Sequence, residues 1–177
     1  GNVLIGRNAG VDVTTGDYNV AIGYQAADAM VGESNANLAI GADALGAEAS
    51  GADNCIAIGY AALATQNDAS AVNLAIGREA GDAITSGTGN VLIGHTAGSA
   101  IADDSQNTAL GYAALAGSTA GDYNTAIGSN ALAAAVTGSS NVAVGSFALG
   151  AAVGAMGDNT AVGTAALFGL NVADNTD

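Results

Sequence analysis

Apolar and polar positions repeat along this chain with a period of 17 or 18 residues. The repeated phrase is NVLIG at residues 2–6, NVAIG at 19–23 and NTAVG at 159–163. Counting from the closing glycine as position 0, nine of the ten copies have Asn at −4. Every copy has an aliphatic residue or Thr at −3, a small or aliphatic residue at −2, an aliphatic at −1 and Ala at +3. So regular a period predicts a stack of units that contact mainly their neighbours. The ten anchoring glycines are Gly6, Gly23, Gly41, Gly59, Gly77, Gly94, Gly111, Gly128, Gly145 and Gly163.

The phrase before each glycine predicts a short β-strand. Side chains alternate between the two faces of a strand, so positions −3 and −1 share one face and position −2 shares the other with the glycine. Positions −3 and −1 are mostly branched aliphatics. Position −2 is Ala in eight copies and Leu in the other two (Leu4 and Leu92). Because both faces are apolar, we expect a strand that is covered on both sides.

The rest of each repeat predicts a tight turn at the glycine, a second short strand at about +1 to +5, and a return loop. The loop is rich in turn-forming Gly, Asp, Ser, Thr and Asn and absorbs all the length variation. We therefore expect one all-β domain over residues 1–177, a parallel β-solenoid (β-roll) of ten 17–18-residue coils, about 48 Å long at the usual strand spacing. We expect the Asn of position −4 either to bond from coil to coil or to cap a turn with positive φ.

Two columns vary together in size. Position +4 is Leu in six copies, but Gly10 and Gly98 stand there in the two copies with Leu4 and Leu92 at −2. This predicts that the two columns fill one space. Gly81, whose repeat has Ala at −2, should leave a void unless a neighbour fills it. The residues that best represent the predicted structural columns are Asn19, Ile22, Gly23, Ala26, Asn124, Ile127, Gly128 and Ala131.

Composition and charge restrict the kinds of partner that this chain can bind. Hydrophobic residues make up 50% of the chain but aromatics only 4%, and 27 residues are Gly, which favours a thin core of small side chains. Sixteen acidic residues against two arginines give a formal net charge of −14, which disfavours nucleic acid and anionic membranes. The single Cys55 excludes an intrachain disulfide, and replaces Asn at −4, where we expect a buried, inert thiol. No signal peptide or membrane-spanning run is evident.

The phrase NxAIGxxA, repeated with Gly-containing turns, resembles the YadA-like head repeat of trimeric autotransporter adhesins. It is equally similar to repeats of phage tail fibres, and NTAIGSNAL at residues 124–132 is a close instance. The resemblance covers all ten repeats and implies a left-handed parallel β-roll that forms a homotrimer about a fibre axis. The usual head repeat is shorter than this one, and the longer repeat favours a virion fibre or another extracellular filament.

Few residues suggest a binding, catalytic or metal site. Position +1 is variable and predicted to be exposed, and it supplies the candidates for contact with a host-surface glycan or protein: Tyr24, Tyr60, Arg78, His95 and Tyr112. The plainer interpretation is that they cover the roll or lie between chains. His95 has no Ser or Asp partner at a triad spacing. Asp103 and Asp104 are a weak candidate for Ca²⁺, and no zinc, phosphate-loop or nucleophile-elbow motif is present.

These features predict a non-enzymatic structural fibre module, a stiff spacer with host-surface contacts in a virion tail fibre or similar extracellular appendage, without cofactor. Two alternatives remain: the head of a bacterial surface adhesin that binds matrix or cells, and the subunit of a self-assembling extracellular filament. The expected partner is a further copy of the chain, in a homotrimer or end to end. Because residue 1 begins inside a repeat phrase, we expect a segment of a longer fibre.

Overall fold

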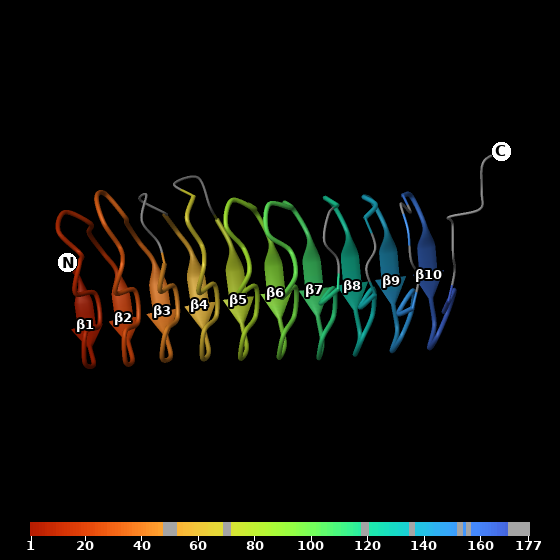
Figure 1. Cartoon of the computed structure of the whole chain (residues 1–177), viewed down its shortest axis with the longest axis horizontal. Helices are drawn as coiled ribbons and strands as arrows, with labels where there is room; N and C mark the ends of the chain where they lie inside the picture. Colours follow the sequence, from red (N-terminus) through yellow and green to blue (C-terminus); the bar gives the residue numbers. More distant parts are fainter. Residues whose placement is uncertain are drawn as a thin grey trace.

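Each repeat forms one three-residue β-strand at positions −3 to −1 (Figure 1). The structure is a computed structural model that describes residues 1–47, 53–68, 72–117, 121–134, 137–151, 154 and 157–169. The strands are β1 (Val3–Ile5), β2 (Val20–Ile22), β3 (Leu38–Ile40), β4 (Ile56–Ile58), β5 (Leu74–Ile76), β6 (Val91–Ile93), β7 (Thr108–Leu110), β8 (Thr125–Ile127), β9 (Val142–Val144) and β10 (Thr160–Val162).

The ten strands form a single parallel sheet in chain order. Each strand pairs only with the strands of the preceding and following repeats, in a register that places like positions opposite each other; Ala21, for example, pairs with Ala39. Parallel neighbours require a crossover, and here each crossover is the remainder of one coil. The predicted all-β parallel solenoid is therefore confirmed.

The predicted second strand at +1 to +5 is wrong. The chain there makes successive turns, with the left-handed φ of position +2 at Gln25 (51°) and of position +4 at Leu45 (54°) as examples. This conformation still bonds coil to coil: Gln25 N–H donates to the Arg7 carbonyl of the preceding coil, and Leu45 N–H to the Ala62 carbonyl of the following one. Left-handed residues turn the chain inward while satisfying the backbone, which an extended strand cannot do within so short a coil.

The interior is filled by positions −2, +3 and +4. Most alanines at −2 and +3 and leucines at +4 are fully buried. The predicted size compensation is confirmed: a Cβ placed on Gly10 would lie 2.6 Å from Cδ2 of Leu4, and one on Gly98 would lie 2.7 Å from Cδ2 of Leu92. The large residue of position −2 thus occupies the space that Leu at +4 fills elsewhere.

Gly81 leaves no void because neighbours fill its space. A Cβ there would lie 2.7 Å from Leu92 of the next coil, and 3.1 Å from Ile84 and Leu63. Ile84 belongs to position +7, a column that the sequence analysis did not identify. That position is large in the coils with a small residue at +4, where it carries Val13, Met30, Ile84 and Ile101.

Candidate functional site

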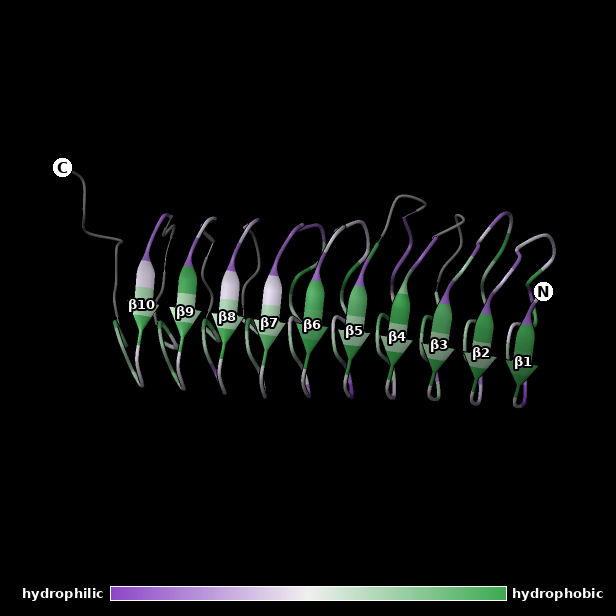
Figure 2. Cartoon of the chain, turned by 180° about the vertical axis from the view of Figure 1, so that it is seen from behind, coloured by the Kyte–Doolittle hydropathy of each residue, from purple (hydrophilic) through white to green (hydrophobic). Residues whose placement is uncertain are grey.

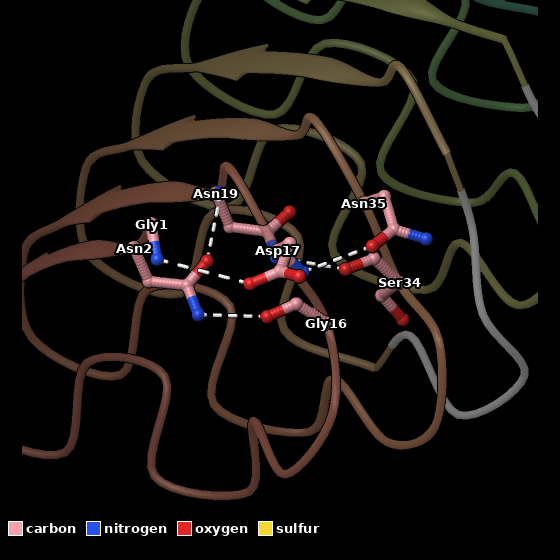
Figure 3. Close-up of polar contacts among 7 residues, drawn as sticks. All are labelled: Gly1, Asn2, Gly16, Asp17, Asn19, Ser34 and Asn35. Atoms are coloured by element: carbon pink, nitrogen blue, oxygen red, sulfur yellow. Dashed lines mark hydrogen bonds and ion pairs between the residues drawn. The ribbon is translucent and has the colours of Figure 1, made fainter.

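The Asn column at position −4 forms a ladder inside the rod, interrupted at Cys55. Asn2 Oδ1 accepts the backbone N–H of Asn19 at 2.9 Å, and Asn19 Oδ1 accepts that of Asn37 at 2.9 Å. The amide nitrogens donate to the return loop, from Asn2 to the Gly16 carbonyl and from Asn19 to the Ser34 carbonyl, each at 2.7 Å (Figure 3). The same acceptor bond recurs at Asn124, which receives Asn141 N–H at 3.0 Å. Each Asn therefore satisfies a buried backbone group and fixes its loop to the strand.

Cys55 occupies this ladder as the sequence analysis expected, fully buried. Its N–H still donates to Asn37 Oδ1 at 2.9 Å, but its thiol cannot offer a carboxamide to the next coil. Gln66 of the same coil is buried and accepts a hydrogen bond from Asn73 Nδ2 at 2.6 Å. A second amide is thus present where the Asn of the ladder is missing.

A second polar ladder, which the sequence analysis missed, runs along position −6 at the outer end of the loop. Asn35 Oδ1 accepts the N–H of Asp17 (Figure 3), and Asp53 Oδ1 accepts that of Asn35. Further along, Asp122 Oδ1 accepts Ser105 N–H at 2.8 Å and Ser139 Oγ accepts Asp122 N–H at 3.1 Å. The available signal was composition: seven of the nine residues at −6 are Asp, Asn, Ser or Thr, all short acceptors.

The outer face of the sheet is largely apolar, and its side chains stay at least partly exposed among the described residues. Positions −3 and −1 point outward and are partly exposed in most strands, and Leu110 (45%) and Ile127 (36%) are among the more exposed. Figure 2 shows the strands as a hydrophobic band, paler at β7, β8 and β10, where position −3 is Thr. We call the columns at −3 and −1 the sheet face. The expectation of an apolar strand is confirmed, but only the face with position −2 is covered by the chain itself.

Charge is segregated around this face. No acidic residue occurs between positions −4 and +1 of any repeat, so all 16 lie elsewhere in the coils or at the C-terminal end. The chain's two arginines and its one histidine all belong to position +1, directly beside the sheet face: Arg7, Arg78 and His95. The sheet face and its border are therefore the part of the rod that other acidic surfaces can approach without repulsion.

The predicted contact residues at +1 form stacked groups along one edge of the sheet face. The Arg78 guanidinium carbon lies 5.8 Å from the ring centroid of Tyr60, and Arg78 also pairs with Glu79 Oε1 at 2.8 Å. The rings of His95 and Tyr112 are stacked, with centroids 5.4 Å apart and planes inclined by 13°. Tyr24 is paired in the same way with Arg7, at 5.7 Å. The structure thus brings these candidates into one edge, in two sets separated by Ala42.

The acidic loops show two opposite electrostatic environments. Burial, with a smaller contribution from Glu79, raises the pKa of the Asp82 carboxyl above its usual 3.8. Hydrogen bonds from Thr85 and Ser86 lower the pKa of Asp103 below that value. Asp104 Oδ1 accepts the N–H of Gly121 at 2.7 Å, so this carboxylate is already hydrogen-bonded to the backbone of the next coil. Among the described residues, no group of three or more His, Cys, Asp or Glu side chains is placed to hold a metal ion.

Enclosed pockets and membrane-spanning helices are two further features that could indicate a site in the described part of the chain. No enclosed pocket is found there, and none of its segments is a helix of the length and hydropathy that a membrane crossing requires. Comparison with known proteins found no matching protein family, curated protein or solved structure. The features that distinguish this molecule are therefore its sheet face and the +1 edge beside it.

Proposed function

We propose that this chain is a structural module of an extracellular fibre, such as a virion tail fibre, in which it serves as a stiff spacer and presents contact residues along its edge. The observation that carries the proposal is the sheet face, an apolar band along all ten coils that is free of acidic residues on a chain of net charge −14. A face with this composition supports permanent contact with another protein surface.

The occupant we propose is further copies of the same chain, three around one axis. Parallel sheets are ordinarily covered on both faces, and here the chain covers only the face with position −2. The coil repeat makes each chain's sheet face uniform along the rod, so copies can pack side by side over its full length. The resemblance of the repeat to YadA-like heads and phage fibre repeats supports the threefold arrangement and the left-handed winding of the coils.

The interior supports a mechanical role. Strand bonds tie each coil to the next, side-chain bonds at −4 or −6 reinforce most of these junctions, and many of the bonded groups are buried. Bending or unwinding the rod would break bonds in buried layers, which is costly. An assembly of such rods resists unfolding without disulfides.

Sedimentation equilibrium of the purified chain tests the assembly, and small-angle scattering tests its shape. We expect three times the 16.7 kDa mass of one chain at micromolar concentration, and a rigid particle about 48 Å long. A folded chain that sediments as a monomer would contradict the proposal. A trimer whose scattering does not fit three rods packed side by side over their full length would equally contradict the proposal.

A further inference from the structure

The first five coils carry a symmetric pattern at position +1: Arg7, Tyr24, Ala42, Tyr60 and Arg78. Each tyrosine has an arginine on the side away from Ala42, with the guanidinium carbon 5.7 Å from the Tyr24 centroid and 5.8 Å from the Tyr60 centroid. Since one face of each ring is taken by its arginine, the other face of each is directed toward the coil of Ala42. We call these two residues the tyrosine pair.

Backbone bonds hold the three coils of this arrangement in register. Asp43 N–H donates to the Tyr24 carbonyl at 3.0 Å, and Ala61 N–H donates to the Ala42 carbonyl at 2.9 Å. The side chains at +1 therefore rise from the rod one coil apart. Ala42 is too short to reach the space between the tyrosine rings, which are half exposed at 45% and 50%.

The spacing suits one flat ring. Two coil rises separate the tyrosines by roughly 9.6 Å, so a ring placed midway lies about 4.8 Å from each. Aromatic stacking occurs with centroids about 4.5–7 Å apart, so both tyrosines can contact the same inserted ring. In the coils further along, His95 and Tyr112 stack directly on each other at 5.4 Å, which leaves no such interval.

We propose that the tyrosine pair binds a neutral pyranose ring of a glycan, inserted over Ala42. The C–H faces of a sugar pack on the tyrosine rings. Asp43 follows Ala42 in the chain, and its carboxylate makes no hydrogen bond or ion pair within the described residues, so it is free to accept hydroxyl hydrogens. The inference rests on the proposed role of the rod at a host surface.

Charge and hydrogen bonding favour this ligand over other flat groups. A nucleic acid or a long acidic glycan would extend beyond the +1 edge onto the acidic remainder of a chain of net charge −14, and Asp43 adds repulsion next to Ala42 itself. An aromatic side chain of a partner protein would stack equally well, but it offers the Asp43 carboxylate at most one hydrogen-bond donor (Tyr Oη–H or Trp Nε1–H, and none for Phe), whereas a pyranose ring carries several hydroxyl groups. A neutral sugar supplies both the ring and the donors.

Saturation-transfer NMR on the assembled protein tests the inference, with maltohexaose, cellohexaose and chitohexaose as saccharide probes and N-acetyl-tryptophanamide as the aromatic probe. The blocking variant is Ala42→Tyr, which fills the interval with a residue that position +1 accepts in three other coils. Its control is Ser129→Tyr, the same residue introduced at the same position far from the pair. Tyr60→Ala is a second variant, which removes one of the two stacking rings of the tyrosine pair.

We expect at least one saccharide to bind the wild type and Ser129→Tyr equally, to lose its signal with Ala42→Tyr, and to bind roughly fivefold to tenfold more weakly to Tyr60→Ala. Absence of binding by every saccharide, unchanged binding by Ala42→Tyr, or binding of the tryptophan probe alone would overturn the assignment. Sedimentation of each variant is recorded in parallel. A trimeric rod that binds no sugar refutes this inference alone, whereas a monomer refutes the proposed function.

Discussion

At the scale of single residues, position 0 admits only glycine for two separate reasons. Gly128 has φ of 133°, a region that side chains disfavour, and a Cβ there would lie 2.6 Å from the carbonyl carbon of Gly145 in the next coil. Gly163 has a similar φ of 125°, but among the described residues a Cβ on it would meet only Ala166 Cβ, at 4.0 Å. The two positions therefore separate backbone strain from the close approach of coils.

Alanine at these two glycines should have unequal effects. We expect Gly163→Ala to lower the free energy of unfolding by about 1–3 kcal/mol, the usual cost of a strained φ. Gly128→Ala carries the same strain and also forces two coils apart, so we expect it to cost at least about 2 kcal/mol more. Urea unfolding followed by circular dichroism gives both values. Equal losses would mean that the coils can separate without penalty and that φ alone selects glycine.

Two loop carboxylates should respond to pH with opposite signs. The raised pKa of Asp82 means that the folded chain holds this proton more tightly than the unfolded chain, so stability falls as pH rises through and above 3.8. The lowered pKa of Asp103 means the reverse: its contribution is present above 3.8 and is lost as pH falls through the lower folded value. Both residues belong to an acidic chain, so removing either charge relieves the same general repulsion.

We therefore expect Asp82→Asn to melt at a higher temperature than the wild type at pH 7, with the difference shrinking toward pH 3. Asp103→Asn should melt below Asp82→Asn at pH 7, because it loses the charged acceptor of Thr85 and Ser86. Calorimetric melting at both pH values measures the two effects. If the two variants shift together at every pH, only the overall charge matters and the local environments are misread.

At the scale of the coil, the sequence predicts the strands and their register, because alternation and repeat spacing record both. Alternation with a period of two identified the strands, and the spacing of 17 or 18 residues between the ten copies identified their parallel register. The turns at +1 to +5 were mistaken for a strand, since left-handed φ at residues such as Leu45 and Leu63 contradicts the preference of that side chain. Bonds between neighbouring coils hold these residues there, and no local pattern records such bonds.

The interior columns were only partly predictable for a related reason. The compensation in side-chain size between −2 and +4 was visible in the sequence because both positions lie at a fixed distance from the glycine. Position +7 lies in the variable loop, so its share of the core at Met30, Ile84 and Ile101 became evident only from burial. The pair of tyrosines facing Ala42 likewise depends on ring orientation, which the residue types at +1 do not specify.

Leu92 tests how the core is shared between coils. It fills space against Gly98 of its own coil and Gly81 of the preceding one. We expect Leu92→Ala to lower the free energy of unfolding by about 2–5 kcal/mol, the usual cost of a core cavity. Adding Gly98→Leu recreates the commoner arrangement and should recover part of the loss, while the space at Gly81 stays empty. Full recovery, or none, in chemical denaturation would contradict this division of the space.

At the scale of the whole molecule, the rod has two unlike sides. The inner columns and both polar ladders join coils within one chain, whereas the sheet face has no partner in it. Acidic residues surround the rod except at that face and its +1 edge. Association through any other side would bring like charges together, so the charge pattern directs copies of the chain toward sheet-face contact.

A charge placed on the sheet face should therefore prevent assembly without unfolding the coil. Ile127 is 36% exposed and is the last residue of β8, in the row of position −1 between Leu110 and Val144 of the adjacent strands. In Ile127→Asp, the carboxylate can reach water in the single chain but would be desolvated without a partner between chains, so we expect sedimentation to report a monomer with near-native circular dichroism. The matched control is Ser139→Asp, the same charge change in the loop, where Asp17 and Asp122 occupy the same position in other coils. That variant should keep the mass of the wild type. If Ile127→Asp assembles as the wild type does, the sheet face is not the contact between chains; if it unfolds entirely, the outer row stabilises the single coil more than its exposure implies.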